Sequence, residues 1–186
     1  MSGGYAYVAN YGTNSVSVCQ VSGSTGALSS CAPTGPGFGD PYGIAVSGGY
    51  AYVTNALGGF VSVCQVSGST GALSSCATTD PGAFVLPRGI AVSGGYAYVA
   101  NSNTTDVGYV VSVCLVSGST GALSSCAPTG SGFGDSPGIA VSGGYAYVTN
   151  PLNGDVSVCQ VSGSTGALSS CAPTGLGFAP YGIAVS

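Results

Sequence analysis

Short runs in which β-branched and small polar residues alternate recur along this chain, separated by clusters of turn-forming residues. The clearest run is VSVCQV at residues 16–21, followed by the cluster SGSTG and then by a second run, ALSSC. Alternation over a few residues, bounded by glycine and serine, is typical of β-strands. The segment 16–31 therefore predicts a β-hairpin.

This hairpin is one part of a longer repeat. Residues 61–76 and 156–171 copy 16–31 letter for letter, and residues 111–126 differ only in having Leu115 in place of glutamine. Each copy follows a Tyr-Ala-Tyr-Val run and precedes a Gly/Pro-rich connection that ends in Gly-Ile-Ala-Val-Ser. Each unit thus has four expected strands, here named inner (Ile-Ala-Val), second (Tyr-Ala-Tyr-Val), third (Val-Ser-Val-Cys) and outer (Ala-Leu-Ser-Ser-Cys).

The length of the repeat indicates the fold. Tyr5, Tyr50, Tyr96 and Tyr145 mark a period of 45 to 49 residues. Four short strands at this period are typical of β-propeller blades. We predict an all-β fold, a β-propeller made of four four-stranded antiparallel blades of about 46 residues in one domain. The domain spans 1–186, with units near 1–47, 48–93, 94–142 and 143–186.

The two cysteines of each hairpin are placed to form a disulfide. With a turn centred on Thr25, Cys19 lies directly opposite Cys31. Directly opposed residues can have Cα atoms about 4.5 Å apart, which a disulfide accepts. Zinc and free buried thiols are the alternatives, but the chain has no CxxC pair and no histidine. We predict four bridges: Cys19–Cys31, Cys64–Cys76, Cys114–Cys126 and Cys159–Cys171.

A family resemblance rests on the second strand and the loop after it. The run from Tyr7 to Val18, YVANYGTNSVSV, resembles the YVTN-type β-propeller repeat, as do YVTN at 52–55 and at 147–150. Gly26-Ala27-Leu28 is similar to the lactonase-like propellers of the same broad group. The resemblance implies a propeller, and its members include surface-layer proteins and sugar-lactone hydrolases.

The order of the strands leaves the closure of the propeller open. The chain starts at a second strand and its last segment, 182–186, reads as an inner strand. We expect this segment to supply the inner strand of the first blade, in cis or from a neighbouring chain. Three arrangements satisfy this pairing: a four-bladed monomer, an eight-bladed dimer, and an open fibre.

The variable parts of the units are expected on one face. In a meandering blade, the loops between second and third strands share a face with the connections between units; we call it the loop face, and the opposite one the turn face. Copies differ chiefly at the loop face, and every charged residue falls there. Varied loops on a rigid scaffold often bind ligands, although free drift after duplication also explains them. The candidate binding residues are Tyr11, Asp40, Phe60, Asp80, Arg88, Asp106, Tyr109, Asp135 and Asp155.

Two further patterns have both a functional and a packing interpretation. Asp40, Asp80 and Asp135 precede inner strands and could gather around Ca²⁺, although turn capping is the commoner role. Phenylalanines recur between units at Phe38, Phe133 and Phe178, where we expect them to wedge blades apart rather than to stack on sugars.

Composition excludes several classes of function. The chain has one arginine, five acidic residues, no histidine and a net charge of −4. Nucleic acid is excluded as a partner because a phosphate-binding patch needs cations. Membrane insertion is not expected, since no apolar run approaches about 20 residues. With the cysteines paired, Asp and Tyr are the remaining acid–base groups, so we expect no enzyme activity, no metal and no cofactor.

Two non-enzymatic functions then fit the sequence. The first is an extracellular or cell-surface structural module that assembles with copies of itself into a ring or filament through its complementary terminal strands. The alternative is a propeller that binds a glycan or a protein through the loop face. The regular cysteine pairs favour an oxidising compartment and hence secretion. The expected partner is another copy of the chain, or a surface glycan or protein.

Overall fold

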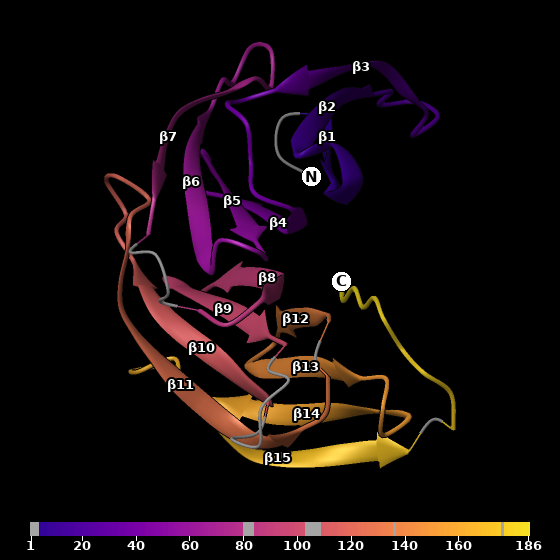
Figure 1. Cartoon of the computed structure of the whole chain (residues 1–186), viewed down its shortest axis with the longest axis vertical. Helices are drawn as coiled ribbons and strands as arrows, with labels where there is room; N and C mark the ends of the chain where they lie inside the picture. The colour runs from indigo at the N-terminus through magenta and orange to yellow at the C-terminus, as the bar shows by residue number, and fades with distance from the viewer. Residues whose placement is uncertain (1–3, 80–83, 103–108, 136, 176) are drawn as a thin grey trace.

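The chain forms four antiparallel sheets that follow one another round an arc in the computed structural model (Figure 1). The structure describes residues 4–79, 84–102, 109–135, 137–175 and 177–186. Each of the last three sheets takes its inner strand from the end of the preceding repeat unit, so the blades are offset from the expected units. The propeller fold predicted from the repeat is confirmed.

Each sheet is one blade, with its strands in sequence order. Blade 1 contains β1 (Tyr5–Asn10), the 3-10 helix η1 (Tyr11–Thr13), β2 (Ser15–Val21) and β3 (Leu28–Thr34). Blade 2 contains β4 (Pro41–Ser47), β5 (Tyr50–Asn55), β6 (Phe60–Val66) and β7 (Leu73–Thr78). Blade 3 contains β8 (Pro87–Ser93), β9 (Tyr96–Asn101), β10 (Tyr109–Val116) and β11 (Leu123–Phe133). Blade 4 contains β12 (Ile139–Ser142), β13 (Tyr145–Asn150), β14 (Asp155–Val161) and β15 (Leu168–Gly175).

Blade 1 has three strands where the other blades have four. The inner strands β4, β8 and β12 line the concave side of the arc, and the inner edge of β1 has no strand paired to it among the described residues (Figure 1). Gly182–Ser186 forms no strand. Figure 1 shows the arc open between blade 1 and blade 4. The supply of an inner strand to blade 1 by the C-terminal segment therefore stays a prediction.

The core lies between the blades. One apolar cluster fills each of the three junctions between neighbouring blades, and the second and third strands together contribute most of its buried residues. At the junction of blades 1 and 2, for example, Val16, Val53 and Leu73 are buried around Phe38. Phe133 has the same role between blades 3 and 4. The expected wedge role is thus met at Phe38 and Phe133.

Four disulfides close the outer hairpins, as the cysteine spacing predicted. Each joins cysteines 12 residues apart, with Cα atoms 3.9 to 4.1 Å apart. In blade 1, Val18 pairs with Ala32, but Gln20 pairs with Ser29, so the register shifts by one residue between them. The shift is a β-bulge, in which Ser30 adopts a left-handed conformation (φ 50°) beside the bridge.

Because of the bulge, the position of the turn and the length of the outer strand differ from our prediction. The turn is closed by the pair Ser22 and Ala27, half a residue from a centre at Thr25. Beyond the bulge, β3 continues past the cysteine to Thr34, which pairs with Val16. Pro33 is tolerated there because an outer strand is a sheet edge, where a missing N–H costs no ladder bond.

Candidate functional site

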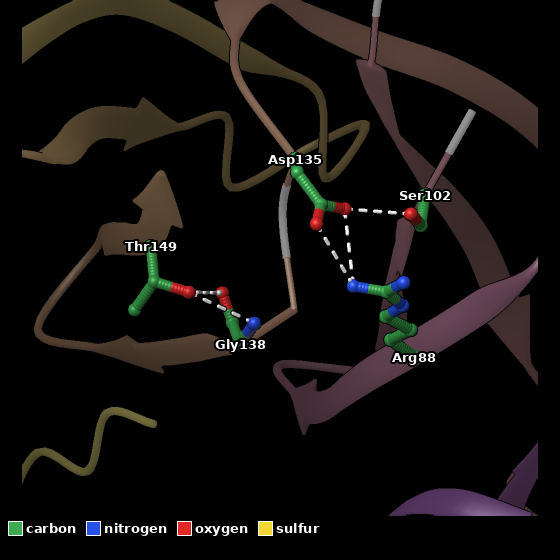
Figure 2. A network of polar contacts seen from close by, with 5 residues as sticks. All are labelled: Arg88, Ser102, Asp135, Gly138 and Thr149. Carbon is green, nitrogen blue, oxygen red and sulfur yellow. Dashed lines mark hydrogen bonds and ion pairs between the residues drawn. The ribbon is translucent and has the colours of Figure 1, made fainter. Parts of the chain in front are cut away.

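The side chains best suited to ionic or acid–base chemistry meet on the loop face. Arg88 opens β8, Ser102 directly follows β9, and Asp135 lies in the connection between β11 and β12 (Figure 2). They come from a loop and two connections that the strand order places at one end of blades 3 and 4. The expectation that these segments share a face is met at this cluster.

Asp135 holds the cluster together. The Nη1 group of Arg88 donates to both carboxylate oxygens of Asp135, at 3.1 and 3.0 Å, and Ser102 Oγ donates to Asp135 Oδ1 at 2.6 Å (Figure 2). The side chains of Arg88 and Asp135 keep 26% and 21% of their surface exposed. The ion pair is therefore partly shielded from water and still accessible to a small molecule.

The remaining donors of Arg88 are available. Among the described residues, neither Nε nor Nη2 of Arg88 has a hydrogen-bond partner. A guanidinium presents its donors in a rigid planar fork that matches an oxyanion or a carboxylate. Arg88 can thus bind Asp135 on one side and a ligand oxygen on the other.

Tyrosines extend the site toward blade 1. The guanidinium carbon of Arg88 lies 5.4 Å from the centre of the Tyr42 ring, a cation–π distance. Tyr11 contacts Tyr42 edge to face, with ring centres 6.0 Å apart. Both rings are exposed. The site therefore extends from the ion pair along the planar side chains of Arg88, Tyr42 and Tyr11.

Buried threonines position the inner strands that carry the cluster. Thr54 Oγ1 accepts from the amide of Gly43 at 2.8 Å and donates to the carbonyl of Arg88 at 2.6 Å, so it ties blade 2 to the start of β8. Thr149 Oγ1 makes the same local bonds with the amide and carbonyl of Gly138, at 2.9 and 3.2 Å (Figure 2). The backbone on both sides of the ion pair is thereby held.

In blades 2 and 4, the asparagine that ends the second strand anchors the connection before it. Asn55 Oδ1 accepts from the amide of Gly39, and Asn150 Oδ1 accepts from the amide of Gly134, next to Asp135. Both asparagines are fully buried. Their amide groups donate to serines of the third strand, Ser62 and Ser157. The connections that form the loop face are thus fixed by buried polar side chains.

Three of the predicted binding residues are brought together and others are not. Tyr11, Arg88 and Asp135 lie in the site. Phe60 lies against Gly58 in its own loop, and Asp155 accepts from Asn150 at 2.6 Å. The side chain of Asp40 makes no hydrogen bond or ion pair among the described residues. Asp80, Asp106 and the side chain of Tyr109 lie outside the described residues.

Two residues of the site were not predicted. Tyr42 stands between proline and glycine at the start of the inner strand β4, the same place that Arg88 occupies in β8. That shared position was the signal that could have found it. Ser102 follows the second-strand asparagine in a loop whose sequence is unique, and nothing in the sequence singles it out.

The described part of the chain contains no group of three residues suited to hold a metal ion. Asp135 is paired with Arg88, and Asp80 lies outside the described residues, so the gathering of Asp40, Asp80 and Asp135 around Ca²⁺ stays untested. No described helix is long and apolar enough to cross a membrane. The four disulfides indicate an oxidising compartment.

Clefts are found away from this cluster. They lie between blades 2 and 3 and between blades 3 and 4, and one of about 210 Å³ is lined by Tyr96, Tyr98, Val141 and Gly163. Their walls come from the turns and from strand residues, and none of the lining residues is charged. We assign no chemistry to these clefts.

Comparison with known proteins supports the repeat and the fold. The model of the LVIVD repeat matches four segments, 1–18, 38–63, 87–107 and 133–158, one in each unit. Each of the last three segments covers the inner strand and the second strand of one blade. A comparison with curated protein sequences finds no match. The narrower YVTN-type assignment stays a prediction.

Several solved structures share the fold at low identity. The periplasmic gluconolactonase of Pseudomonas aeruginosa matches with a TM-score of 0.73 and 20% identity, over 97% of this chain and 54% of that one. A Bacteroides fragilis protein proposed to be a 6-phosphogluconolactonase matches with a TM-score of 0.71 and 18% identity, over 97% and 54%. A Lactobacillus plantarum protein matches with a TM-score of 0.74 and 20% identity, over 96% and 54%. The chain thus spans about half the length of these structures.

These matches correct our expectation about function. A non-enzymatic structural module, or a propeller that only binds, is contradicted because structural neighbours carry the names of lactone hydrolases. The names of these neighbours likewise contradict the expectation of no enzyme activity. It counted the missing His, Lys and Glu, but did not foresee that folding brings Asp135, Arg88 and Ser102 into one cluster.

Proposed function

We propose that this chain takes part in the hydrolysis of a sugar lactone, with the reaction at Arg88, Ser102 and Asp135. The observation that carries the proposal is the two-pronged contact of Arg88 Nη1 with Asp135, which leaves the other donors of the guanidinium open. A carboxylate beside an available cation is a minimal set for ester hydrolysis. The carboxylate can act as a general base, and the cation can stabilise an oxyanion.

The reaction would use these groups as follows. Asp135 takes a proton from a water molecule as the water oxygen adds to the lactone carbonyl carbon. Arg88 donates to the carbonyl oxygen, which becomes an oxyanion. The ring C–O bond then breaks, and the departing alkoxide receives the proton from Asp135. The product is an open-chain hydroxy acid, whose carboxylic proton passes to solvent.

The charge of the chain favours an unphosphorylated substrate. Arg88 is the only Lys or Arg in the sequence, and the net charge is −4. A sugar phosphate carries nearly two negative charges at neutral pH and would compete with Asp135 for this one cation. A neutral lactone needs no second cation, and its ring can lie on the exposed face of Tyr42, as sugars do on aromatic rings.

The opening of glucono-δ-lactone tests the proposal. The acid that is released is measured over time, and the rate of spontaneous opening in buffer is subtracted. Asp135→Asn should lower the catalysed rate by about 10²-fold or more, since it removes the base. Arg88→Gln should lower it by a similar factor through the lost oxyanion donor. Asp40→Asn is the matched control, because it makes the same change at an acidic residue of the loop face whose carboxylate has no hydrogen-bond or ion-pair partner among the described residues.

Two results would count against this function. Wild-type protein that opens the lactone no faster than buffer contradicts it outright. Equal rates for wild type, Asp135→Asn and Arg88→Gln place any activity elsewhere. A preference for the 6-phosphorylated lactone would contradict only the proposed substrate. We place the activity outside the cytoplasm, on the cell surface or in the surrounding medium, because of the four disulfides.

A further inference from the structure

The molecule repeats one directional contact at each of its three blade junctions. The first tyrosine of a second strand donates its hydroxyl to a carbonyl in the outer hairpin turn of the next blade. The pairs are Tyr5 with Ser69 at 2.6 Å, Tyr50 with Ser119 at 2.8 Å, and Tyr96 with Ser164 at 2.8 Å. One blade therefore always supplies the tyrosine, and the following blade always supplies the turn.

A glycine in the turn makes room for the tyrosine ring. Gly71, Gly121 and Gly166 have φ of 68° to 70°, and a Cβ at each would lie 2.5 Å from a ring carbon of the incoming tyrosine. The leucine two residues later is covered by the junction, as Leu73 and Leu168 show. The contact thus combines a hydrogen bond, a close ring approach and apolar burial.

Blade 4 presents the tyrosine half of this contact without a receiver. Tyr145 is 44% exposed, and its hydroxyl has no hydrogen-bond partner among the described residues. Phe178, the counterpart of the buried wedges Phe38 and Phe133, is 61% exposed. We call Tyr145 and Phe178 the donor face.

Blade 1 presents the matching receiver half. Its turn, residues 22–26, has the same sequence as the turns that receive a tyrosine elsewhere, and Gly26 has the same conformation, with φ of 71°. Leu28 is 54% exposed, although its counterparts Leu73 and Leu168 are buried. Val8 is also exposed, whereas its counterpart Val148 is fully buried. We call Gly26, Leu28 and Val8 the receiver face.

We propose that the occupant of each face is a second copy of this chain, so that two copies pair head to tail into one closed ring. The donor face of each copy packs on the receiver face of the other, with the same residues that already pack at the internal junctions. No charged residue is present on either face, so nothing there repels. The matched structures hold about twice as much chain, the amount that two copies provide. Head-to-tail contacts of this kind either close a ring or grow into a fibre.

Native mass spectrometry and light scattering after gel filtration test the pairing. The wild type should be a dimer that dissociates on dilution. Leu28→Asp places a charge on the receiver face, and Tyr145→Arg places one on the donor face. Because each junction uses one face of each kind, either variant alone should weaken dimerisation at least about tenfold.

Mixing the two variants separates this arrangement from others. In a mixed pair, one junction is wild type, and the other joins the carboxylate introduced by Leu28→Asp with the guanidinium introduced by Tyr145→Arg. The mixture should therefore form dimers that contain one copy of each variant, although neither variant dimerises alone. An isologous contact behaves differently: one variant would retain full dimerisation and mixing would rescue nothing.

Leu57→Asp is the matched control. Leu57 is an exposed leucine in the loop between β5 and β6, on the loop face and away from both end faces, so this variant should dimerise like the wild type. Thermal melts show that each variant is folded. A wild type that stays monomeric at every concentration overturns the proposal. Filaments in place of dimers also overturn it, because they exclude the closed ring.

Discussion

At the scale of single residues, hydroxyl groups decide where the reactive side chains stand. Thr54 is fully buried and satisfies two backbone groups at once, one of them the carbonyl of Arg88. A buried backbone group that loses its partner costs about 1–3 kcal/mol. The position of the guanidinium therefore depends on a residue of the neighbouring blade.

Thr54→Val tests this dependence while keeping the side-chain shape. We expect the free energy of unfolding to fall by about 2 kcal/mol, because the Gly43 amide and the Arg88 carbonyl lose their partner. Lactone hydrolysis should fall as well. Urea denaturation and the lactone assay measure the two effects. Thr149→Val is the comparison, because Thr149 makes the equivalent bonds to Gly138 and none to Arg88. Equal activity losses in both variants would contradict a specific role for Thr54.

The buried tyrosines make stability sensitive to alkali. The pKa values of Tyr7, Tyr52 and Tyr98 are raised above the ordinary 10.0. Burial is the larger cause, and the neighbouring tyrosine of the same strand is the smaller one. A raised pKa of an acid means that the folded state favours the neutral phenol. This stabilisation is complete below pH 10 and is lost as the pH rises through the raised folded values.

We therefore expect a flat melting temperature from neutral pH to about pH 9 and a steep fall above pH 10. Circular dichroism melts across this range measure it. Tyr98→Phe should be nearly neutral at pH 7 and should make the alkaline fall shallower, since one ionising group is removed. A melting temperature that declines steadily with pH from pH 7 upward would contradict the tyrosine explanation.

At the scale of elements, the hairpin is the unit that the repeat preserves. Its bulge places two residues of the outer strand opposite one of the third strand, and the left-handed serine recurs at Ser30, Ser75, Ser125 and Ser170. The bridge beside it closes a short loop. In the chain-entropy model such a bridge contributes about 3 kcal/mol, because it restricts the unfolded chain.

The paired change Cys64→Ala and Cys76→Ala should lower the free energy of unfolding by about 3 kcal/mol in guanidinium titrations. The pair Cys19 and Cys31 is the control, since it closes a loop of the same separation, 12 residues. Similar losses in both variants indicate loop closure. A loss confined to blade 2 would instead indicate that packing at the junction is the main contribution.

At the scale of the whole molecule, the inner strands of neighbouring blades approach each other closely. A Cβ on Gly43 would collide with the carbonyl of Arg88 in the next blade, and one on Gly89 would lie 2.8 Å from the carbonyl of Pro137. Both obstacles are backbone atoms, which cannot rotate aside. Glycine at this place in each unit therefore allows neighbouring inner strands to meet.

Gly43→Ala should destabilise the protein by about 2 kcal/mol or more and should disturb the site, because it pushes β8 away from blade 2. Gly12→Ala is the control: its Cβ meets nothing within 4 Å, and its effect should stay within about 0.5 kcal/mol. Thermal melts and the lactone assay compare the two. A neutral Gly43→Ala would show that the blades tolerate a wider spacing.

The repeat itself determined the strands, the blades and the four disulfides, because these depend on local patterns that each unit carries within about 46 residues. The meander also placed Tyr11, Arg88 and Asp135 on one face. The tertiary structure alone decided that Ser102 and Tyr42 join Arg88 and Asp135, since those contacts form between units and no pattern within a unit encodes them. It also decided that Tyr145 and Leu28 stay exposed, because residues of identical local sequence differ only in whether a neighbouring blade covers them.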